Sequence, residues 1–150
     1  MLTEGANALD FTLKNVDGKE IALSNFKGKK VVLYFYPKDD TPGCTKQACS
    51  FRDWYDDILD KGAVVIGVSP DNNESHVKFK EKFNLPFFLL SDNEHEVAQM
   101  YGAWGEKNVY GKKSVGMLRT TFIIDEEGKI IKVFKKVDTK NHGEDVLKYL

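Results

Sequence analysis

Hydrophobic residues occur along this chain in short continuous runs, separated by longer segments in which apolar and polar positions mix. The runs Lys30–Tyr36, Ala63–Ser69 and Phe87–Ser91 are almost wholly apolar. Runs of this length and composition are typical of strands that are covered on both faces. Pro37, which lacks a backbone donor, ends the first of them. The pattern therefore predicts a central sheet that is buried between helices.

Two hairpins are predicted, one near each end of the chain. The dipeptide Asp17-Gly18 is a strong hairpin turn signal between two strand-like segments. Near the C-terminus, the polar segment Asp125–Gly128 separates two further strand-like runs. The strands predicted for these hairpins are Phe11–Asn15 with Ile21–Leu23, and Leu118–Ile124 with Lys129–Lys135.

Helices are predicted in the remaining intervals, and the longest ends before Gly62, which is a good C-cap. Strands that alternate with helices predict an α/β fold, with a central mixed β-sheet flanked by helices and an N-terminal β-hairpin. No repeat or linker divides the chain, so residues 1–150 are expected to form a single domain. The predicted helices are Thr41–Lys61, Asn73–Phe83, Asn93–Tyr101 and Asn141–Leu150.

The charges nearly cancel, with 22 Lys and Arg against 23 Asp and Glu and a net charge of −1. This balance argues against a broad basic face for nucleic acid. No apolar run approaches the roughly 20 residues of a membrane span, and the first residues lack the basic and apolar regions of a signal peptide. We therefore expect a cytoplasmic protein with no nucleic-acid or membrane partner. The two cysteines are too few for a disulfide scaffold, and a cytoplasmic pair is more often catalytic, redox-active or buried.

The segment from Tyr36 to Cys49 joins the most apolar strand to the longest helix, and it contains both cysteines. Reaction sites in open α/β sheets lie at the carboxyl ends of strands. Thr41 suits the N-cap and Pro42 the first helical position, so Cys44 is predicted at position N3. This position favours an anionic thiolate, because the first N–H groups lack intrahelical acceptors and the helix dipole adds partial positive charge. Cys44 is therefore the candidate nucleophile.

The two cysteines face different sides of the predicted helix. Cys44 belongs to an apolar stripe at helical spacing, whereas Cys49 lies beside Asp53 and Asp56 on the polar face. In an intact helix their Cα atoms would lie about 8–9 Å apart, beyond the roughly 7 Å that a disulfide spans. The pair can therefore bond only if the helix unwinds locally. On the residues alone, two inert thiols remain the alternative. The apolar stripe consists of Cys44, Ala48, Phe51, Tyr55 and Ile58.

Other polar residues offer weaker signals. The cysteine spacing C-x₄-C differs from the C-x-x-C of thioredoxin-like dithiols. His76, His95 and His142 match no zinc spacing and are expected on helix surfaces. The segment Gly105–Ser114 is similar to a phosphate-binding loop, but its spacing is wrong and it follows a helix, so we reject it. Arg119 stands in an otherwise apolar strand and needs an anionic partner, for which a structural ion pair with an acidic residue is one alternative.

At these residues the sequence strongly resembles the peroxiredoxins, in particular the PrxQ or bacterioferritin comigratory protein group. The family pattern Pro-x-x-x-Thr-x-x-Cys is present as Pro37, Thr41 and Cys44, and the group's second cysteine is present as Cys49. The family's distal arginine is present as Arg119. The likeness covers most of the chain, and no catalytic position departs from the pattern.

The resemblance implies a thioredoxin-like fold and a thiol peroxidase that reduces hydrogen peroxide and organic hydroperoxides. It implies that Cys44 is the peroxidatic cysteine and Cys49 the resolving cysteine, which form a Cys44–Cys49 disulfide after reaction. It also implies thioredoxin or a similar dithiol as the reductant, no metal or bound cofactor, and a monomer rather than a decamer.

The remaining site residues are expected to support the chemistry at Cys44. Arg119 is expected to stabilise the thiolate and the charge that develops on the peroxide. The Thr41 hydroxyl is expected to bind the thiolate or the peroxide, and the Gly43 N–H group to bind the substrate. Pro37 and Pro42 are expected to shape the pocket and limit the access of water.

Three other functions stay open on the sequence. A thiol–disulfide carrier of the same fold is the first, and the absence of a C-x-x-C motif argues against it. The second is a non-enzymatic redox sensor that passes its disulfide to a partner, and the third is a plain binding module. Catalytic consumption of peroxide with a reductant supplied would distinguish an enzyme from these.

Overall fold

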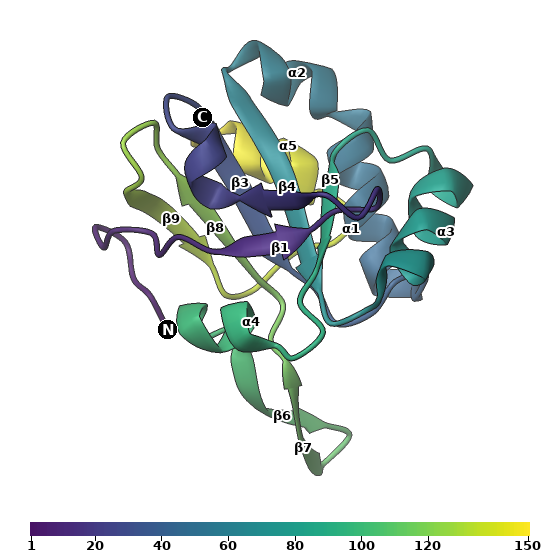
Figure 1. Ribbon diagram of the computed structural model, residues 1–150. Coiled ribbons are helices and arrows are strands. Elements are labelled where there is room, and N and C mark those ends of the chain that lie inside the picture. The colour runs from purple at the N-terminus through teal and green to yellow at the C-terminus, as the bar shows by residue number, and fades with distance from the viewer.

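The computed structural model describes the backbone of residues 1–150 and every side chain except that of Val109. Its strands are β1 (Thr12–Lys14), β2 (Glu20–Ala22), β3 (Lys30–Phe35), β4 (Ala63–Ser69), β5 (Phe88–Ser91), β6 (Trp104–Val109), β7 (Lys112–Met117), β8 (Thr120–Ile124) and β9 (Ile130–Phe134). Seven of them form one sheet in the order β2-β1-β5-β4-β3-β8-β9 (Figure 1). Strand β3 runs parallel to β4 and antiparallel to β8, so the sheet is mixed, as predicted.

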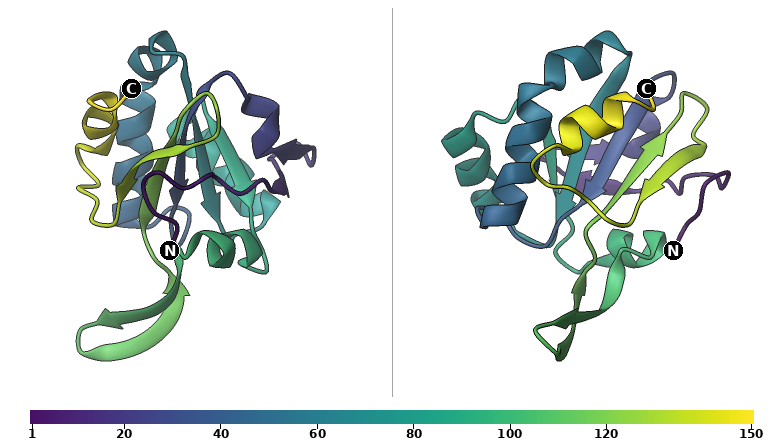
Figure 2. Two further views of the ribbon diagram at one scale, coloured as in Figure 1. Left: turned by 90° about the vertical axis from the view of Figure 1, so that its left-hand side faces the viewer. Right: turned by 180° about the vertical axis from the view of Figure 1, so that it is seen from behind.

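Helical segments cover both faces of this sheet (Figure 2). One face packs against α1, α2, α3 and α5, and its core contains Val32 and Tyr34 of β3. The other face packs against α4 and the N-terminal segments, and its core contains Val31, Leu33 and Phe35. The alternation along β3 therefore divides its side chains between two cores. The helices are η1 (Leu23–Phe26), α1 (Pro42–Asp53), α2 (Tyr55–Asp60), α3 (Asn73–Phe83), α4 (Glu96–Tyr101) and α5 (His142–Leu147).

The single helix predicted from Thr41 to Lys61 is in fact two helices. The break falls at Trp54, whose backbone angles are φ −104° and ψ 7°, outside regular helix geometry. The Trp54 N–H donates to the carbonyls of both Ser50 and Arg52, which tightens the turn at the end of α1. The apolar stripe continues across the break, because all of its members are buried on both sides of it.

A two-stranded hairpin of β6 and β7 projects from the body of the molecule below α4 (Figure 1). We call this hairpin the arm. Its turn is formed by Tyr110 and Gly111, which both have positive φ angles, as a two-residue hairpin turn of type I′ requires. Tyr110 is fully exposed, and Trp104 at the base of the arm stacks on His95. The arm has no clear signal in the sequence and was not predicted, because its strands bury few side chains and lack an apolar alternation.

The prediction that all three histidines lie on helix surfaces is wrong for His76 and His142, which are fully buried. His76 Nδ1 lies 2.7 Å from an oxygen of Asp39, and His142 Nε2 lies 2.8 Å from the hydroxyl of Thr121. Each partner is far away in the sequence, so the local pattern carries no sign of it.

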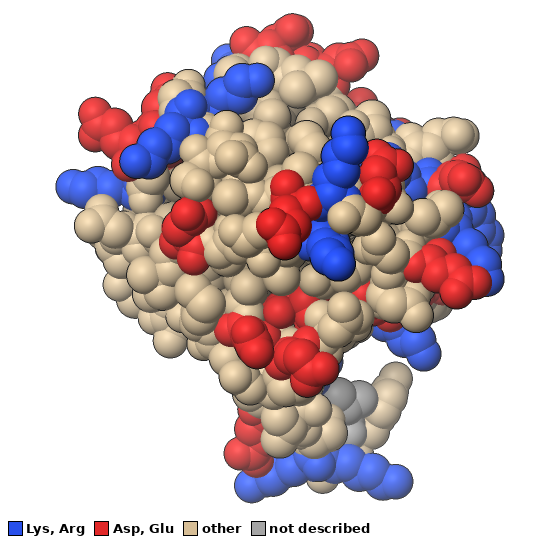
Figure 3. Space-filling view, in the orientation of Figure 1, with Lys and Arg blue, Asp and Glu red and all other residues tan. Residues whose placement is uncertain are grey.

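The surface is mixed in charge on the face that Figure 3 shows, where Lys and Arg are interspersed with Asp and Glu. None of the helices described in the structure has the length and apolar character needed to cross a membrane.

Candidate active site

The N-terminus of α1 lies just beyond the carboxyl end of β3, at the centre of the sheet. Thr41 occupies the N-cap with extended backbone angles, and Pro42 is the first helical residue. Cys44 is therefore at position N3, as predicted. The Thr45 N–H donates to the Thr41 carbonyl at 2.8 Å and closes the first turn. The N–H groups of Gly43 and Cys44 precede this first helical bond and are directed toward the open end of the helix.

Cys44 is buried within the inner face of α1, with 1% of its surface exposed. Ala48 and Phe51 continue this face and are also buried, which confirms the predicted apolar stripe. Cys49 is only partly buried. The two thiols therefore experience different surroundings although they belong to one helix.

Arg119 contacts the Cys44 sulfur directly. It immediately precedes β8, which pairs with β3, and its Nη2 donates to Cys44 Sγ at 3.3 Å. Its Nη1 donates to Gln47 Oε1 at 2.6 Å. Among the described side chains, no carboxylate lies within 4.0 Å of Arg119. Arg119 therefore has the Cys44 sulfur and Gln47 as its partners, and the interpretation as a structural ion pair with an acidic residue was wrong.

Gly43 allows the guanidinium to lie this close. A Cβ atom placed on Gly43 would be 3.3 Å from Nη2 of Arg119, which is tighter than most contacts of a real Cβ. A side chain at this position would press on the guanidinium that contacts the Cys44 sulfur. Gly43 therefore has a positional role beside the sulfur.

The other predicted residues lie in the loop before α1. The Thr41 hydroxyl donates to the Lys38 carbonyl at 2.9 Å, and the side chain makes no N-cap hydrogen bond. Pro37 is partly buried, whereas Pro42 is exposed at the first turn of α1. The loop thus brings Thr41 next to the helix N-terminus, with its hydroxyl turned back toward the loop.

Two uncharged residues of the site escaped the sequence analysis. Gln47 is fully buried and accepts a hydrogen bond from Arg119. Tyr34 of β3 is also buried, and burial raises the pKa of its hydroxyl well above the ordinary value. Within the described part of the chain, neither Gln47 Nε2 nor the Tyr34 hydroxyl has a hydrogen-bond partner. The sequence did offer one sign of Gln47: it lies one helical turn after Cys44, and therefore on the same side of the predicted helix.

The base of the arm also contributes charge to this region. Lys107 of β6 is partly buried, and partial burial is the main cause that lowers its pKa. The positive charge of Arg119 lowers this pKa further, and negative charge on Cys44 acts in the opposite direction. A second cation therefore lies within the electrostatic range of the sulfur.

Cys49 has the opposite character from Cys44. Burial raises the pKa of its thiol, with a smaller contribution from Asp53, while Arg52 lowers it. Both cysteines are free thiols, and α1 is continuous from Pro42 to Asp53. Because a disulfide spans at most about 7 Å, an intact α1 keeps the two sulfurs from bonding.

The arrangement can therefore present one sulfur, flanked by a guanidinium and by free backbone donors, to an electrophile. A second thiol one turn further along is available after local unwinding. Nucleophilic attack by sulfur on an electrophilic atom, followed by thiol exchange, is the chemistry that this geometry suits.

Comparison with known proteins agrees with this chemistry. Residues 5–133 match the AhpC/TSA family. The chain is 51% identical to peroxiredoxin Bcp of Bacillus subtilis over 146 residues, which cover 97% of this chain and 93% of that protein.

Solved structures show the same relationship. The fold superposes on the Xanthomonas campestris bacterioferritin comigratory protein, whose structures concern its alkyl peroxide reduction activity, with a TM-score of 0.87 at 34% identity. That alignment covers 93% of this chain and 88% of the other. The Xylella fastidiosa PrxQ superposes with a TM-score of 0.92 at 29% identity, over 99% and 95% of the two chains.

Proposed function

The chain belongs to the AhpC/TSA family of peroxiredoxins, which are peroxidases, and on this premise we propose that it reduces hydrogen peroxide and organic hydroperoxides through Cys44 and Cys49. The observation that carries the proposal is the contact of Arg119 Nη2 with Cys44 Sγ at the N-terminus of α1. The alkyl peroxide reduction activity of the Xanthomonas campestris relative supports organic hydroperoxides as part of the substrate class.

In the first step the Cys44 thiolate attacks one oxygen of the peroxide. An S–O bond forms and the O–O bond breaks, so the sulfur is oxidised to a sulfenic acid. The departing oxygen leaves with the electron pair of the O–O bond and takes a proton, which gives water or an alcohol. Arg119 is well placed to stabilise the charge that moves from sulfur to this oxygen.

The residues around Cys44 would position the peroxide. The free N–H groups of Gly43 and Cys44 can donate to a peroxide oxygen at the helix N-terminus. We propose that the Thr41 hydroxyl leaves the Lys38 carbonyl and binds the peroxide when it arrives. Pro37 would hold the strand end that leads into this loop, and Pro42 would fix the first turn of α1.

In the second step the Cys49 thiol attacks the Cys44 sulfenic acid. An S–S bond forms, and the hydroxyl of the sulfenic acid leaves as water with the thiol proton. Since an intact α1 holds the cysteines apart, the helix must unwind over roughly its first two turns. The buried side chains of this segment are Cys44, Gln47, Ala48 and Ser50, and Phe51, the first large apolar one, follows it.

Amide hydrogen exchange tests the unwinding. We expect exchange in residues 45–50 to be faster in the oxidised protein than in the reduced protein, because the helical hydrogen bonds of this segment are lost. Trp54 lies about one helical turn beyond Cys49, so its fluorescence should change when the disulfide forms. Equal protection in both redox states, with the disulfide established by mass, would contradict the unwinding.

In the third step a dithiol reduces the disulfide by exchange and restores both thiols. We propose thioredoxin or a similar dithiol of the reducing cytoplasm as the donor. We also propose that residues 1–150 act as a single domain and as a monomer. The second thiol lies on the same helix as the first, so the cycle needs no cysteine from another copy.

Two serine variants test the assignment of roles. We expect Cys44→Ser to abolish peroxide reduction, because only Cys44 contacts Arg119 at the helix N-terminus. We expect Cys49→Ser to consume about one equivalent of peroxide per chain and then stop as a sulfenic acid. Multiple turnover by Cys44→Ser would refute the assignment. Stoichiometric consumption by the unsubstituted protein, with reductant supplied, would favour a redox sensor.

A further inference from the structure

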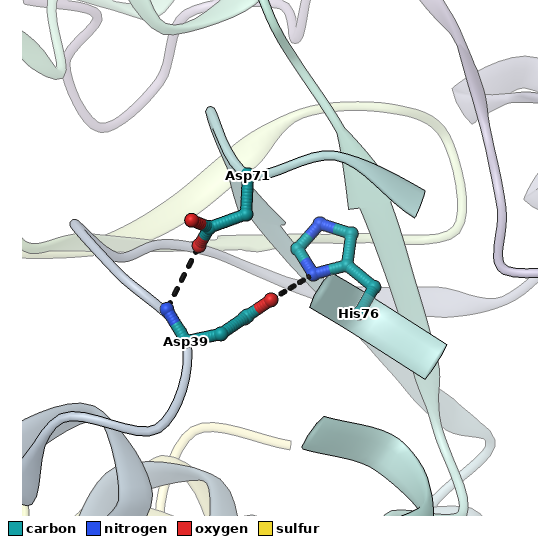
Figure 4. Close-up of side chains that lie close together, drawn as sticks. All are labelled: Asp39, Asp71 and His76. Carbon is teal, nitrogen blue, oxygen red and sulfur yellow. Dashed lines mark hydrogen bonds and ion pairs between the residues drawn. The ribbon is translucent and has the colours of Figure 1, made fainter. Parts of the chain in front are cut away.

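A second buried polar cluster lies beside the loop between β3 and α1, and Asp39 is its centre (Figure 4). Asp39 Oδ1 accepts from the Tyr36 hydroxyl at 2.6 Å. Its Oδ2 accepts from the Ser75 hydroxyl at 2.8 Å and lies 2.7 Å from His76 Nδ1. The Asp39 N–H donates to a carboxylate oxygen of Asp71 at 2.8 Å. The loop is thereby fixed to the first turn of α3 and to the segment that precedes it.

The hydrogen-bond partners of this cluster are all protein groups. His76 Nε2 lies 3.1 Å from the Leu90 carbonyl, which can only accept, so this nitrogen must bear a hydrogen. Tyr36 and Ser75 both donate to the Asp39 carboxyl group. A further hydrogen lies between Asp39 Oδ2 and His76 Nδ1, and both side chains are buried.

The same three side chains, Asp39, Asp71 and His76, are close enough to hold a cation. The hydrogen bonds argue against that use. Both carboxylate oxygens of Asp39 and both ring nitrogens of His76 already have partners. The cluster is therefore complete as an anchor that consists of protein groups alone.

The loop that Asp39 anchors contains a strained residue. Asp40 has a φ angle of 56°, in the left-handed region that few residues other than glycine adopt. Such a conformation persists only where the neighbouring structure fixes it. The preceding residue, Asp39, is held through its N–H group and both carboxylate oxygens. The side chain of Asp40 makes only an exposed ion pair with Lys82. The contacts of Asp39 thus maintain the strained conformation of Asp40, which directly precedes Thr41 and the start of α1.

We propose that Asp39 and His76 form a buried ion pair, and that this pair is a positioning device for the peroxide step. It fixes the loop so that Thr41 stays next to the N–H groups of Gly43 and Cys44, with its hydroxyl on the Lys38 carbonyl until the peroxide arrives. It also stays closed when α1 unwinds, because its partners lie in α3 and β5 and not in α1. The helix N-terminus can then return to the same place after each reduction.

The inference rests on the proposed peroxidase function, and its test separates the two half-reactions. In a cycle with a covalent enzyme intermediate, kcat/KM for the peroxide reports only oxidation of Cys44, and kcat/KM for the reductant reports only reduction of the disulfide. The test uses the full chain with hydrogen peroxide and dithiothreitol. Asp39→Asn keeps the shape of the side chain and removes the ion pair.

We expect Asp39→Asn to lower kcat/KM for peroxide by about ten- to a hundredfold, because small misplacements of reacting groups have effects of this size. We expect kcat/KM for dithiothreitol to stay within about twofold, since reduction takes place on the unwound segment. The matched control is Lys82→Ala, which removes the exposed ion pair of the same loop. It should leave both values within about twofold of the unsubstituted protein.

A parallel fall in both values, or an unchanged value for peroxide, would overturn the proposal, because a merely structural role affects both half-reactions alike. If Asp39→Asn fails to fold, Ser75→Ala removes one donor to Asp39 and should reduce only the peroxide value, by a smaller factor. Nitrogen NMR of the His76 ring provides a readout that does not depend on peroxidase activity. Two protonated ring nitrogens at neutral pH are expected, and a neutral ring would overturn the ion pair.

Discussion

Replacement of Arg119 by alanine is the sharpest test of the chemistry at Cys44. The substitution removes the donor whose Nη2 lies 3.3 Å from the sulfur. We expect α1 and the backbone of β8 to stay in place, because the Arg119 side chain contacts α1 through Cys44 and Gln47 and does not belong to either apolar core cluster. The substitution therefore acts first on the reacting atoms.

The size of the effect follows from the role of such donors in other enzymes. Removal of a single preorganised donor to a developing charge slows the reaction by about 10²–10³-fold, or about 2.7–4 kcal/mol. The stability effect is separate. Gln47 Oε1 loses its partner in a fully buried position, at a cost of about 1–3 kcal/mol in the free energy of unfolding.

The assay is the oxidation of reduced protein by hydrogen peroxide in single-turnover stopped flow, in the Cys49→Ser background so that only sulfenic acid forms. Arg119→Lys retains the charge but cannot donate to Cys44 and Gln47 together in the same fork geometry, so an intermediate rate is expected. Gln47→Ala keeps the guanidinium and removes only its second contact, and should slow the reaction less than Arg119→Ala does.

A rate for Arg119→Ala within about threefold of the parent would refute the reasoning, since this is far below the loss expected for a charge-stabilising donor. Arg119 would then be a structural residue that holds Gln47. Urea unfolding of the same variant measures that contribution independently.

Three further predictions concern buried groups near the site. Burial is the main cause that lowers the pKa of His142 from 6.5 to about 4, and the charge of Arg119 lowers it further. Because the unfolded chain binds this proton at higher pH than the folded protein does, the stability that neutral His142 contributes is complete above pH 6.5 and is lost as the pH falls toward 4. The free energy of unfolding should therefore fall by about 2 kcal/mol between pH 7 and pH 5 through this residue, and His142→Gln should remove that part of the pH dependence in urea titrations. Tyr34→Phe should change the free energy of unfolding by less than about 1 kcal/mol in either direction, because the buried hydroxyl has no partner among the described residues; a loss above about 2 kcal/mol would reveal a hidden partner. Gly67→Ala should cost about 1–3 kcal/mol in chemical denaturation, because its Cβ would lie 2.8 Å from the buried Tyr34 ring; an unchanged midpoint would contradict this packing.

The sequence was most informative where the local pattern and the burial agree. The apolar run Ala63–Ser69 and the amphipathic segment Asn73–Phe83 became β4 and α3 with the predicted bounds. Cys44 could be placed at N3 because Thr41 and Pro42 encode the helix start locally. The order of the strands could not be derived in the same way, because it depends on contacts between distant segments.

Residues whose partners are distant in the chain were the ones that sequence reasoning misjudged. His76 is buried because Asp39 and the Leu90 carbonyl satisfy its ring. The local sequence marks Gln47 only as an ordinary helix residue, because its hydrogen-bond partner Arg119 lies 72 positions later in the chain. The arm was missed for another reason. It has no core of its own, so the turn at Tyr110 and Gly111 was its only local signal.

The break at Trp54 has a consequence for how the protein tolerates repeated turnover. In the proposed cycle α1 opens at every turnover. An opening that spread along one continuous helix would also detach α2 from the sheet. Tyr55 and Ile58 of α2 cover apolar side chains that would then face water, and transiently exposed surface of this kind leads to aggregation. A separate α2, which packs on β4, limits the exposure to the buried side chains of α1. The break between α1 and α2 thus keeps the unwinding of α1 from exposing apolar surface that causes aggregation. A variant in which α1 and α2 form one continuous helix should therefore aggregate faster during peroxide turnover than in the absence of peroxide.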